Sequence, residues 1–200
     1  YNLEEGRNGM SSYRNDSKLI AFFGRITYDY LSRYLMTFSL RYEGSSKFGN
    51  NNKWGTFPSV ALGWNIANED FLKENKILSN LKLRLSWGVA GNSAIDAYAP
   101  SLATYYTNQL GSYYYFGNEL INPVTALGYN ADLKWETTTT WNVGLDYGFL
   151  NGRISGGIDF YYRKTDDLIN KIPVSALSNL TNYLTSNIGN LENTGVEFEI

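Results

Sequence analysis

Carboxylate pairs are the first residues in this sequence with the capacity for chemistry. Asp166 is followed by Asp167, and Asp132 lies close to Glu136. Two carboxyl groups can act as acid and base in glycoside hydrolysis, and clustered carboxylates can bind calcium. The spacing matches no EF-hand loop. Because the chain contains neither histidine nor cysteine, it lacks the commonest general base and thiolate metal ligands. The sequence therefore predicts no catalytic residue, no metal site and no cofactor.

Aromatic residues gather in one long polar stretch of the chain. The faces of their rings stack well on sugar rings, and the tyrosine hydroxyl adds a polar tip. We expect this stretch to form a loop that contacts a substrate or a partner protein; the alternative is that the rings pack only against one another. The six residues are Tyr105, Tyr106, Tyr113, Tyr114, Tyr115 and Phe116.

Glycine recurs at short intervals in the second half of the chain. Glycine-rich loops cradle phosphate where they join a strand to a helix, and no such context is present here. Glycines within strands more often permit close approach of a neighbouring segment, which is the role we expect. The residues are Gly144, Gly148, Gly152, Gly156 and Gly157.

The elements that must position these residues are β-strands, because apolar and polar side chains alternate strictly along the chain. The alternation is clearest from Tyr34 to Glu43, from Leu81 to Ala90 and from Trp135 to Gly148. In total the pattern predicts about seven strands. The other four lie in the ranges Ile20 to Asp29, Pro58 to Ile66, Ile154 to Arg163 and Val196 to Ile200.

The length of the strands separates two fold classes. Most extend over about ten residues or more, whereas strands of soluble sheets usually have about five or six. A strand that crosses a bilayer at a tilt needs about 9–11 residues, with apolar side chains outside, polar ones inside and aromatic residues near both interfaces. Tyr34 and Tyr42, and also Trp135 and Tyr147, lie at the ends of apolar faces. The pattern favours an all-β, antiparallel transmembrane β-barrel segment over a soluble β-sandwich.

The links between strands alternate between short and long. Residues 31–33 form a short link, and Asn151-Gly152 is a typical tight hairpin turn. The links over 44–55, 92–134 and 165–191 are long. Bacterial outer-membrane barrels have short periplasmic turns and long extracellular loops in this alternation.

One link on the side of the short turns is not short. It extends from Ala67 to Asn80. Within it Asn68 precedes Glu69 and Asp70, which is the pattern of a helix N-cap followed by acidic residues in the first turn. We therefore expect a short helical turn from Glu69 to Glu74.

Composition excludes several other classes of protein. With 17 basic and 19 acidic residues and no basic stripe, the chain has no feature of a nucleic-acid partner. No apolar run approaches the roughly 18 residues of a transmembrane helix. The first residues lack the basic and apolar regions of a signal peptide, so we expect a mature chain or an internal segment of a longer one.

Four runs of the chain resemble, in the same order, the SusC/RagA family of TonB-linked outer-membrane proteins. Together they cover nearly half of the sequence. The runs are Phe48 to Leu72 (FGNNNKWGTFPSVALGWNIANEDFL), Leu78 to Asn92 (LSNLKLRLSWGVAGN), Asn130 to Ile169 and Asn187 to Ile200.

The resemblance implies a barrel of about 22 strands around a plug domain, driven by the TonB-ExbB-ExbD complex, in the outer membrane of a Gram-negative, Bacteroidetes-like bacterium. It also implies a SusD-like surface lipoprotein that closes the barrel as a lid, and import of an oligosaccharide or sometimes a peptide. Residues 1–200 would then form part of a single barrel domain, from its C-terminal half, without plug domain or TonB box.

In such a barrel the charged side chains on the polar faces of the strands would line the lumen. Some would contact the plug or the path of the solute; the alternative is a wet wall of mutually paired charges. These residues are Arg25, Arg41, Glu43, Lys82, Arg84, Glu136, Asp146, Asp159 and Arg163. Two other functions compete with active import: glycan binding by a soluble or surface β-sandwich, and passive diffusion through a porin.

Overall fold

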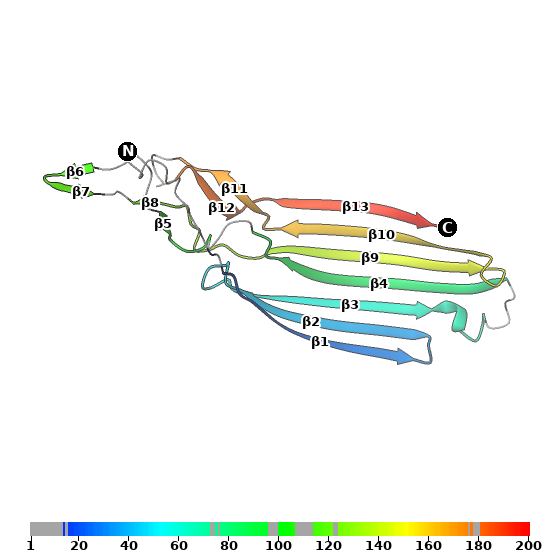
Figure 1. Cartoon of the computed structure of the whole chain (residues 1–200). Coiled ribbons are helices and arrows are strands. Elements are labelled where there is room, and N and C mark those ends of the chain that lie inside the picture. Colours follow the sequence, from blue (N-terminus) through cyan, green and yellow to red (C-terminus); the bar gives the residue numbers. More distant parts are fainter. Residues whose placement is uncertain are drawn as a thin grey trace, which may run out of the picture.

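The computed structural model describes residues 14, 16–72, 75, 77–95, 100–106, 114–121, 124–175, 177 and 181–200. Most of them form one seven-stranded antiparallel sheet that is long, curved and not closed into a barrel (Figure 1). This confirms the predicted all-β class and the seven long strands. In spatial order the strands are β1 (Leu19–Tyr30), β2 (Tyr34–Ser45), β3 (Trp54–Asn65), β4 (Leu78–Asn92), β9 (Glu136–Phe149), β10 (Ile154–Asp166) and β13 (Asn190–Glu199).

Tight turns close the sheet at one end, on the right in Figure 1. Between β1 and β2, Leu31 and Ser32 have φ angles of 55° and 53°, and the Ser32 amide donates to Asp29 Oδ1 at 2.8 Å. Between β9 and β10, Asn151 and Gly152 have φ angles of 60° and 79°. The loop between the paired residues Phe149 and Ile154 spans residues 150–153, and its successive positive φ angles confirm the predicted tight turn at Asn151-Gly152.

The third link at this end contains a helical turn just before the one we expected from Glu69 to Glu74. Of the expected turn, the Leu72 amide donates to the Glu69 carbonyl oxygen at 2.9 Å, and residues 73 and 74 lie outside the described residues. A 3₁₀ helix, η1, spans Ile66–Asn68, so Asn68 is its last residue and not its N-cap. The Asn68 side chain instead donates to the Ser32 carbonyl oxygen at 2.8 Å, and Glu69 is the extended residue after the helix. The acidic pair that resembled a first turn serves ion pairs, described below. Within the described residues, no helix is long and apolar enough to cross a membrane.

Three short ribbons occupy the long links at the other end of the sheet (Figure 1). The sequence predicted only loops there, because strands of two to five residues are too short to produce a recognisable alternation. The ribbons pair β5 (Tyr105–Tyr106) with β8 (Thr125–Ala126), β6 (Tyr114–Phe116) with β7 (Glu119–Ile121), and β11 (Ile169–Pro173) with β12 (Tyr183–Asn187).

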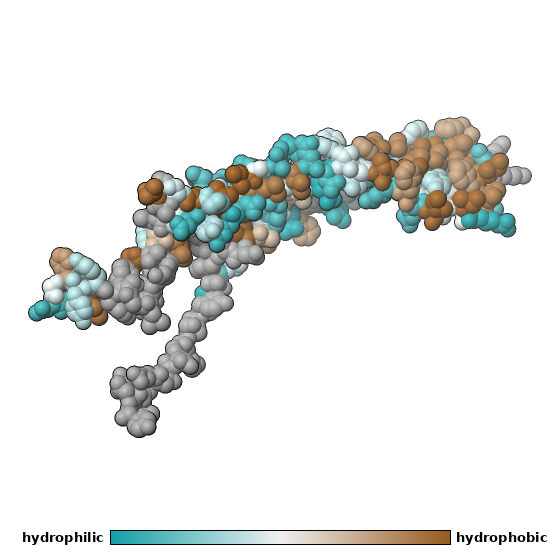
Figure 2. Space-filling view, turned by 90° about the horizontal axis from the view of Figure 1, so that it is seen from above, coloured by the Kyte–Doolittle hydropathy of each residue, from teal (hydrophilic) through white to brown (hydrophobic). Residues whose placement is uncertain are grey.

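The two faces of the large sheet differ in polarity, because neighbouring side chains on a strand point to opposite faces and paired residues share one. The apolar face carries Phe22, Phe160 and Phe198, which are 63%, 47% and 74% exposed. In the described part of the chain, no second layer buries these side chains. In Figure 2 hydrophobic residues gather over the end of the sheet with the tight turns, and hydrophilic ones are frequent toward the long links.

Aromatic side chains lie at both ends of the apolar face. Near the tight turns, the Tyr34 ring stacks on Trp64 with ring centroids 6.5 Å apart. Near the long links, the Tyr42 ring stacks on Trp54 at 4.7 Å. Tyr34 and Tyr42 belong to one strand and are about 26 Å apart along it. This spacing matches an apolar band about 25 Å tall between two aromatic girdles.

Trp135 does not belong to either girdle, contrary to our expectation. The strand begins one residue later, at Glu136, and the Trp135 side chain is 5% exposed. It lies in the small hydrophobic core of the molecule with Phe48, Phe57 and two aliphatic residues. Sequence alternation could not distinguish an aromatic residue at a strand end from one turned inward under a loop.

Candidate functional site

The nine charged residues predicted to line a lumen all lie on the polar face of the sheet. The strand register places them on one side of the five strands that carry them, opposite the apolar residues described above. The structure shows which of these residues contact one another.

Arg84, Asp146 and Asp159 form the most closely connected group on this face. The Arg84 guanidinium on β4 donates from Nε to Asp146 Oδ2 on β9 at 2.9 Å. Its Nη2 donates to Asp146 Oδ1 and to Asp159 Oδ2 on β10, both at 2.8 Å. One cation therefore links three adjacent strands and partly neutralises two carboxylates, in the two-pronged geometry that favours arginine over lysine.

Gly144 is the residue that permits this bridge. It lies on β9 between Arg84 and Asp159 in the same cross-strand row. A Cβ atom there would be 2.5 Å from Asp159 Oδ1 and 2.7 Å from Arg84 Nη2. We predicted close approach at this glycine, and the approaching group is a guanidinium. Gly152 lies in the hairpin turn, and Gly156 faces the apolar side beside Tyr147.

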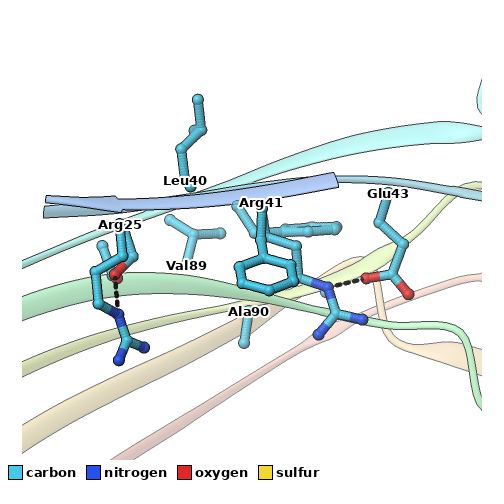
Figure 3. Close-up of a pocket in the computed structure, with 12 residues that line it drawn as sticks. Arg25, Leu40, Arg41, Glu43, Val89 and Ala90 are labelled. Carbon is cyan, nitrogen blue, oxygen red and sulfur yellow. Dashed lines mark hydrogen bonds and ion pairs between the residues drawn. The ribbon is translucent and has the colours of Figure 1, made fainter. Parts of the chain in front are cut away.

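A recess of about 390 Å³ lies on the polar face where β3 and β4 separate. Figure 3 shows Arg25 and Arg41 on one side of the β1–β2 hairpin and Leu40 pointing away from them. Arg25 Nε donates to Ser39 Oγ at 3.1 Å, and Arg41 Nε forms an ion pair with the Glu43 carboxylate. Three of the nine predicted residues therefore line one recess.

Three of the predicted lumen residues lie apart from these two groups. The Glu136 carboxylate is hydrogen-bonded, since it accepts from Asn92 Nδ2 at 3.0 Å and from the Ile169 amide at 3.0 Å. It thereby holds the end of β4 and the start of β11 beside β9. Lys82 and Arg163 have no ion pair within the described part of the chain.

The adjacent carboxylates Asp166 and Asp167 are engaged in ion pairs. Asp167 pairs with Lys134 at 2.7 Å, whereas its neighbour Asp166 pairs with Lys164 at 3.0 Å. The two carboxylates thus serve different cations. Among the described residues, no group of three or more acidic side chains is placed to hold a metal ion.

The predicted aromatic residues separate into two parts of the long links. Tyr114 and Phe116 lie 6.4 Å apart on the β6–β7 ribbon, and both are exposed, as is Tyr115. Tyr105 belongs to the β5–β8 ribbon and is 64% exposed. Tyr106 extends the same ribbon, and Tyr113 lies outside the described residues.

A second recess, of about 350 Å³, lies between two of the long links. Tyr105 and Tyr129 line it from one link, and Thr181 and Leu184 line it from the other. Sequence patterns could not predict this recess, because its two sides are about 50–80 positions apart in the chain. Tyrosine rings beside small polar groups suit a ligand with both ring faces and hydroxyl groups.

The hydrophobic core joins the long links to one another. Phe48 and Leu133 are 1% and 0% exposed, and Phe48 lies 4.7 Å from the Trp135 ring. The backbones come so close that a Cβ at Gly49 would be 1.7 Å from the Ala131 carbonyl oxygen. This cluster joins the link over residues 44–53 to Ile95 and to residues 131–135, which the sequence did not reveal.

A polar cluster around Glu69 fixes the tight-turn end of the sheet. The Tyr34 hydroxyl and the Trp64 indole both donate to Glu69 Oε1, at 2.7 and 2.9 Å. Arg33 donates to Glu69 Oε2 at 3.3 Å and to Asp70 at 2.8 Å. These hydrogen bonds hold the pKa of the buried Glu69 carboxyl below its usual value, the Tyr34 hydroxyl being the largest cause. Glu69 thereby orients two girdle rings.

Comparisons with known proteins agree with this architecture. The whole chain, residues 1–200, matches the family described as TonB dependent receptor-like, beta-barrel. It is 50% identical over 190 residues to the TonB-dependent receptor SusC of Bacteroides thetaiotaomicron, an alignment that covers 95% of this chain and 19% of that protein.

Solved structures agree as well. The RagAB peptide transporter matches with a TM-score of 0.78 and 33% identity, over 91% of this chain and 19% of that chain. The RagAB peptide importer in its open-open state matches with a TM-score of 0.79 and 31% identity, over 98% of this chain and 21% of that chain. The chain therefore spans about a fifth of these relatives, and it belongs to the TonB-dependent receptor β-barrel family, with SusC and RagA as its relatives.

Proposed function

We propose that this chain forms part of the wall and external loops of a TonB-dependent nutrient importer in the outer membrane of a Bacteroidetes-like Gram-negative bacterium. The observation that carries the proposal is the exposed apolar face of the seven strands, with aromatic residues at both of its ends. Water penalises such a surface, whereas the hydrocarbon core of a bilayer covers it. Family membership supports the active form of transport over a passive porin.

The remaining parts of the importer follow from family membership. Residues 1–200 would belong to a single barrel domain, closed by further strands of the full protein, which also supplies the plug domain and TonB box. The TonB-ExbB-ExbD complex would provide the energy. A SusD-like surface lipoprotein would close over the long links. No enzymatic step is part of this proposal, and the adjacent carboxylates Asp166 and Asp167 are paired with lysines.

In this arrangement the polar face lines the lumen. Arg84, Asp146 and Asp159 would serve mainly as a bracing group, since their charges are directed at one another. The unpaired Lys82 and Arg163 would face water, the plug or the solute. Because charges in a wet lumen are screened, such residues affect selectivity more than stability.

The substrate we propose is an oligosaccharide, contacted by the exposed aromatic residues of the long links. The recess between Tyr105 and Tyr129 would take a sugar ring, and Tyr114 and Phe116 would contact substrate or lid. A peptide is the second candidate, because two solved structures that this chain resembles are described as a peptide transporter and a peptide importer.

Location and transport can be tested on the full-length protein in its native cells. We expect it in the outer-membrane fraction, resistant to unfolding by detergent until heated, and associated with a surface lipoprotein. Deletion should abolish growth on one class of oligosaccharide or peptide, and an uncoupler of the proton gradient should stop uptake. Uptake that continues without the gradient would instead support a porin. A soluble protein without membrane association would support the β-sandwich.

The aromatic contacts can be tested with one matched pair of variants. Tyr114→Ala combined with Phe116→Ala removes both rings from one face of the β6–β7 ribbon. Loss of stacking should weaken substrate or lid binding by about fivefold to tenfold. Leu120→Ala is the control, because Leu120 lies on the same ribbon but faces the other side, opposite Tyr115. Equal binding by the double variant and the control would exclude these rings from recognition.

A further inference from the structure

The recess beside Arg25 and Arg41 is lined by charged, aromatic and small residues. The small ones include Ser39, Ser59 and Ala90. It lies where β3 leaves β4: their pairing begins at Ser59 and Gly88 and continues only toward the tight turns. The core residues beneath the long links begin immediately beyond it, because Phe57 belongs to both.

The two arginines direct donors into this recess. They lie diagonally on paired strands, since Arg25 is opposite Ser39 and Arg41 is opposite Phe23. Each guanidinium uses its Nε atom for a neighbour on β2, Ser39 Oγ for Arg25 and the Glu43 carboxylate for Arg41. Within the described residues, the terminal nitrogen atoms of both groups make no further hydrogen bond. Figure 3 shows both side chains extending from the same side of the hairpin.

The charge of the recess is positive even though the chain as a whole has a net charge of −2. Its lining carries two arginines and one glutamate, and the glutamate is buried at 5% exposure against Arg41. A planar guanidinium with two free terminal nitrogens matches the two oxygens of a carboxylate. An incoming anion would therefore find donors that are already oriented.

An aromatic ring stands next to these donors. Phe23 is on the polar face, where it is 86% exposed, and it lines the recess. A phenylalanine on the wet side of a transmembrane strand breaks the alternation that the neighbouring positions keep. Its ring offers an apolar face to the part of a ligand that adjoins the anionic group.

We propose that this recess binds the carboxylate group of an imported solute, with Arg25 and Arg41 as donors and Phe23 as the apolar platform. The inference rests on the proposed function, because only in an importer does the polar face meet solutes in transit. The shared chemistry is a carboxylate next to a ring or chain. Such a group occurs in an acidic sugar and at the end of a peptide.

Calorimetry on the full-length protein, purified from the outer membrane in detergent, would test the proposal. Two matched pairs of probes differ only in the carboxylate: a hexuronic acid trisaccharide against the neutral hexose trisaccharide, and a tripeptide against its C-terminal amide. In at least one pair the acid should bind about tenfold more tightly than its neutral counterpart. The pair that shows the preference identifies the source of the carboxylate.

Two variants and one control make the result specific to the recess. Arg25→Gln combined with Arg41→Gln should abolish the preference for the acid, and Ala90→Phe should do so by filling the recess while both arginines remain. Lys18→Gln combined with Arg153→Gln removes two exposed positive charges elsewhere and should keep the preference. Failure of one variant to fold would leave the other as the test.

The proposal is overturned if neither probe pair shows an acid preference, or if the preference survives in the folded variants. Growth of cells with the Arg25→Gln, Arg41→Gln variant on a neutral nutrient distinguishes this failure from failure of the proposed function. Import that continues without any acid preference would reject the carboxylate recess and leave the importer intact. Absence of import by the unaltered protein would reject the importer itself.

Discussion

The Arg84 guanidinium on β4 donates from Nη2 to Asp159 Oδ2 on β10 at 2.8 Å, across an intervening strand. A contact between side chains two strands apart is possible only where the middle strand carries no side chain in the path. The middle position is Gly144. This relationship makes one glycine and one ion pair mutually dependent.

Gly144→Ala should therefore destabilise the barrel by about 1–3 kcal/mol, the usual cost of inserting atoms into a filled site. The new Cβ would meet Asp159 and Arg84 at 2.5 and 2.7 Å. The temperature at which the full-length protein loses its heat-resistant migration in detergent measures the effect. Gly24→Ala is the matched control, because a Cβ at Gly24 meets nothing within 4 Å. Similar shifts in both variants would contradict this account.

Loss of Arg84 should cost more than loss of Asp159. Asp159→Asn leaves the two-pronged contact between Arg84 and Asp146, so we expect a cost of about 0.5–1 kcal/mol for a pair that is partly open to water. Arg84→Gln leaves two neighbouring carboxylates without their cation, and we expect about 1–2 kcal/mol. Chemical denaturation of the three proteins in one detergent gives the order. The reverse order would mean that Arg84 does not hold the two carboxylates together.

The sequence predicted the sheet well because apolar and polar side chains alternate over ten or more residues in most of the strands. Faces, hairpin turns and the side of every predicted lumen charge follow from period two alone. The same pattern has no information about distances between strands. It placed Arg84 and Asp159 on one face but could not show that they meet, and it misplaced Trp135, whose orientation depends on Phe48 in a distant link.

The tight-turn cluster was missed for a related reason. Glu69 and Asp70 carry the local pattern of a helix start, and that pattern is real. Tertiary contacts compete with this local preference, because Glu69 accepts hydrogen bonds from Tyr34 and Trp64 and forms an ion pair with Arg33. Such contacts outweigh a local helix preference, and no single sequence shows which residues will supply them.

Stability of the tight-turn end should depend on pH through Glu69. The pKa of this carboxyl is lowered in the folded protein, so its contribution is complete above the ordinary value of 4.5 and is lost as the pH falls through the lowered value. Glu69→Gln should therefore melt below the unaltered protein at neutral pH. The difference should shrink as the pH falls below 4.5.

Tyr34→Phe sharpens this test, because the Tyr34 hydroxyl is the largest cause of the lowered pKa. In that variant the pKa of Glu69 moves up toward its ordinary value, and the contribution of the carboxylate should be lost at a higher pH. Glu119→Gln, on the exposed β6–β7 ribbon, is the control for loss of a single negative charge. A difference between Glu69→Gln and the unaltered protein that persists unchanged in acid would refute the linkage.

Leu133→Ala should release the long links while leaving the seven strands intact. The Leu133 side chain is 0% exposed, and the Leu133 carbonyl oxygen accepts from the Gly49 amide at 3.2 Å. Truncation of a buried leucine costs about 2–5 kcal/mol, here drawn from the docking of one link on another. Limited proteolysis of the full-length protein should cut within residues 44–53 far sooner than in the unaltered protein. Leu127→Ala, at a position 48% exposed in the same link, is the control and should not change the cutting rate. If Leu133→Ala lowers the melting temperature of the barrel without faster cutting, the cluster supports the strands instead of the links.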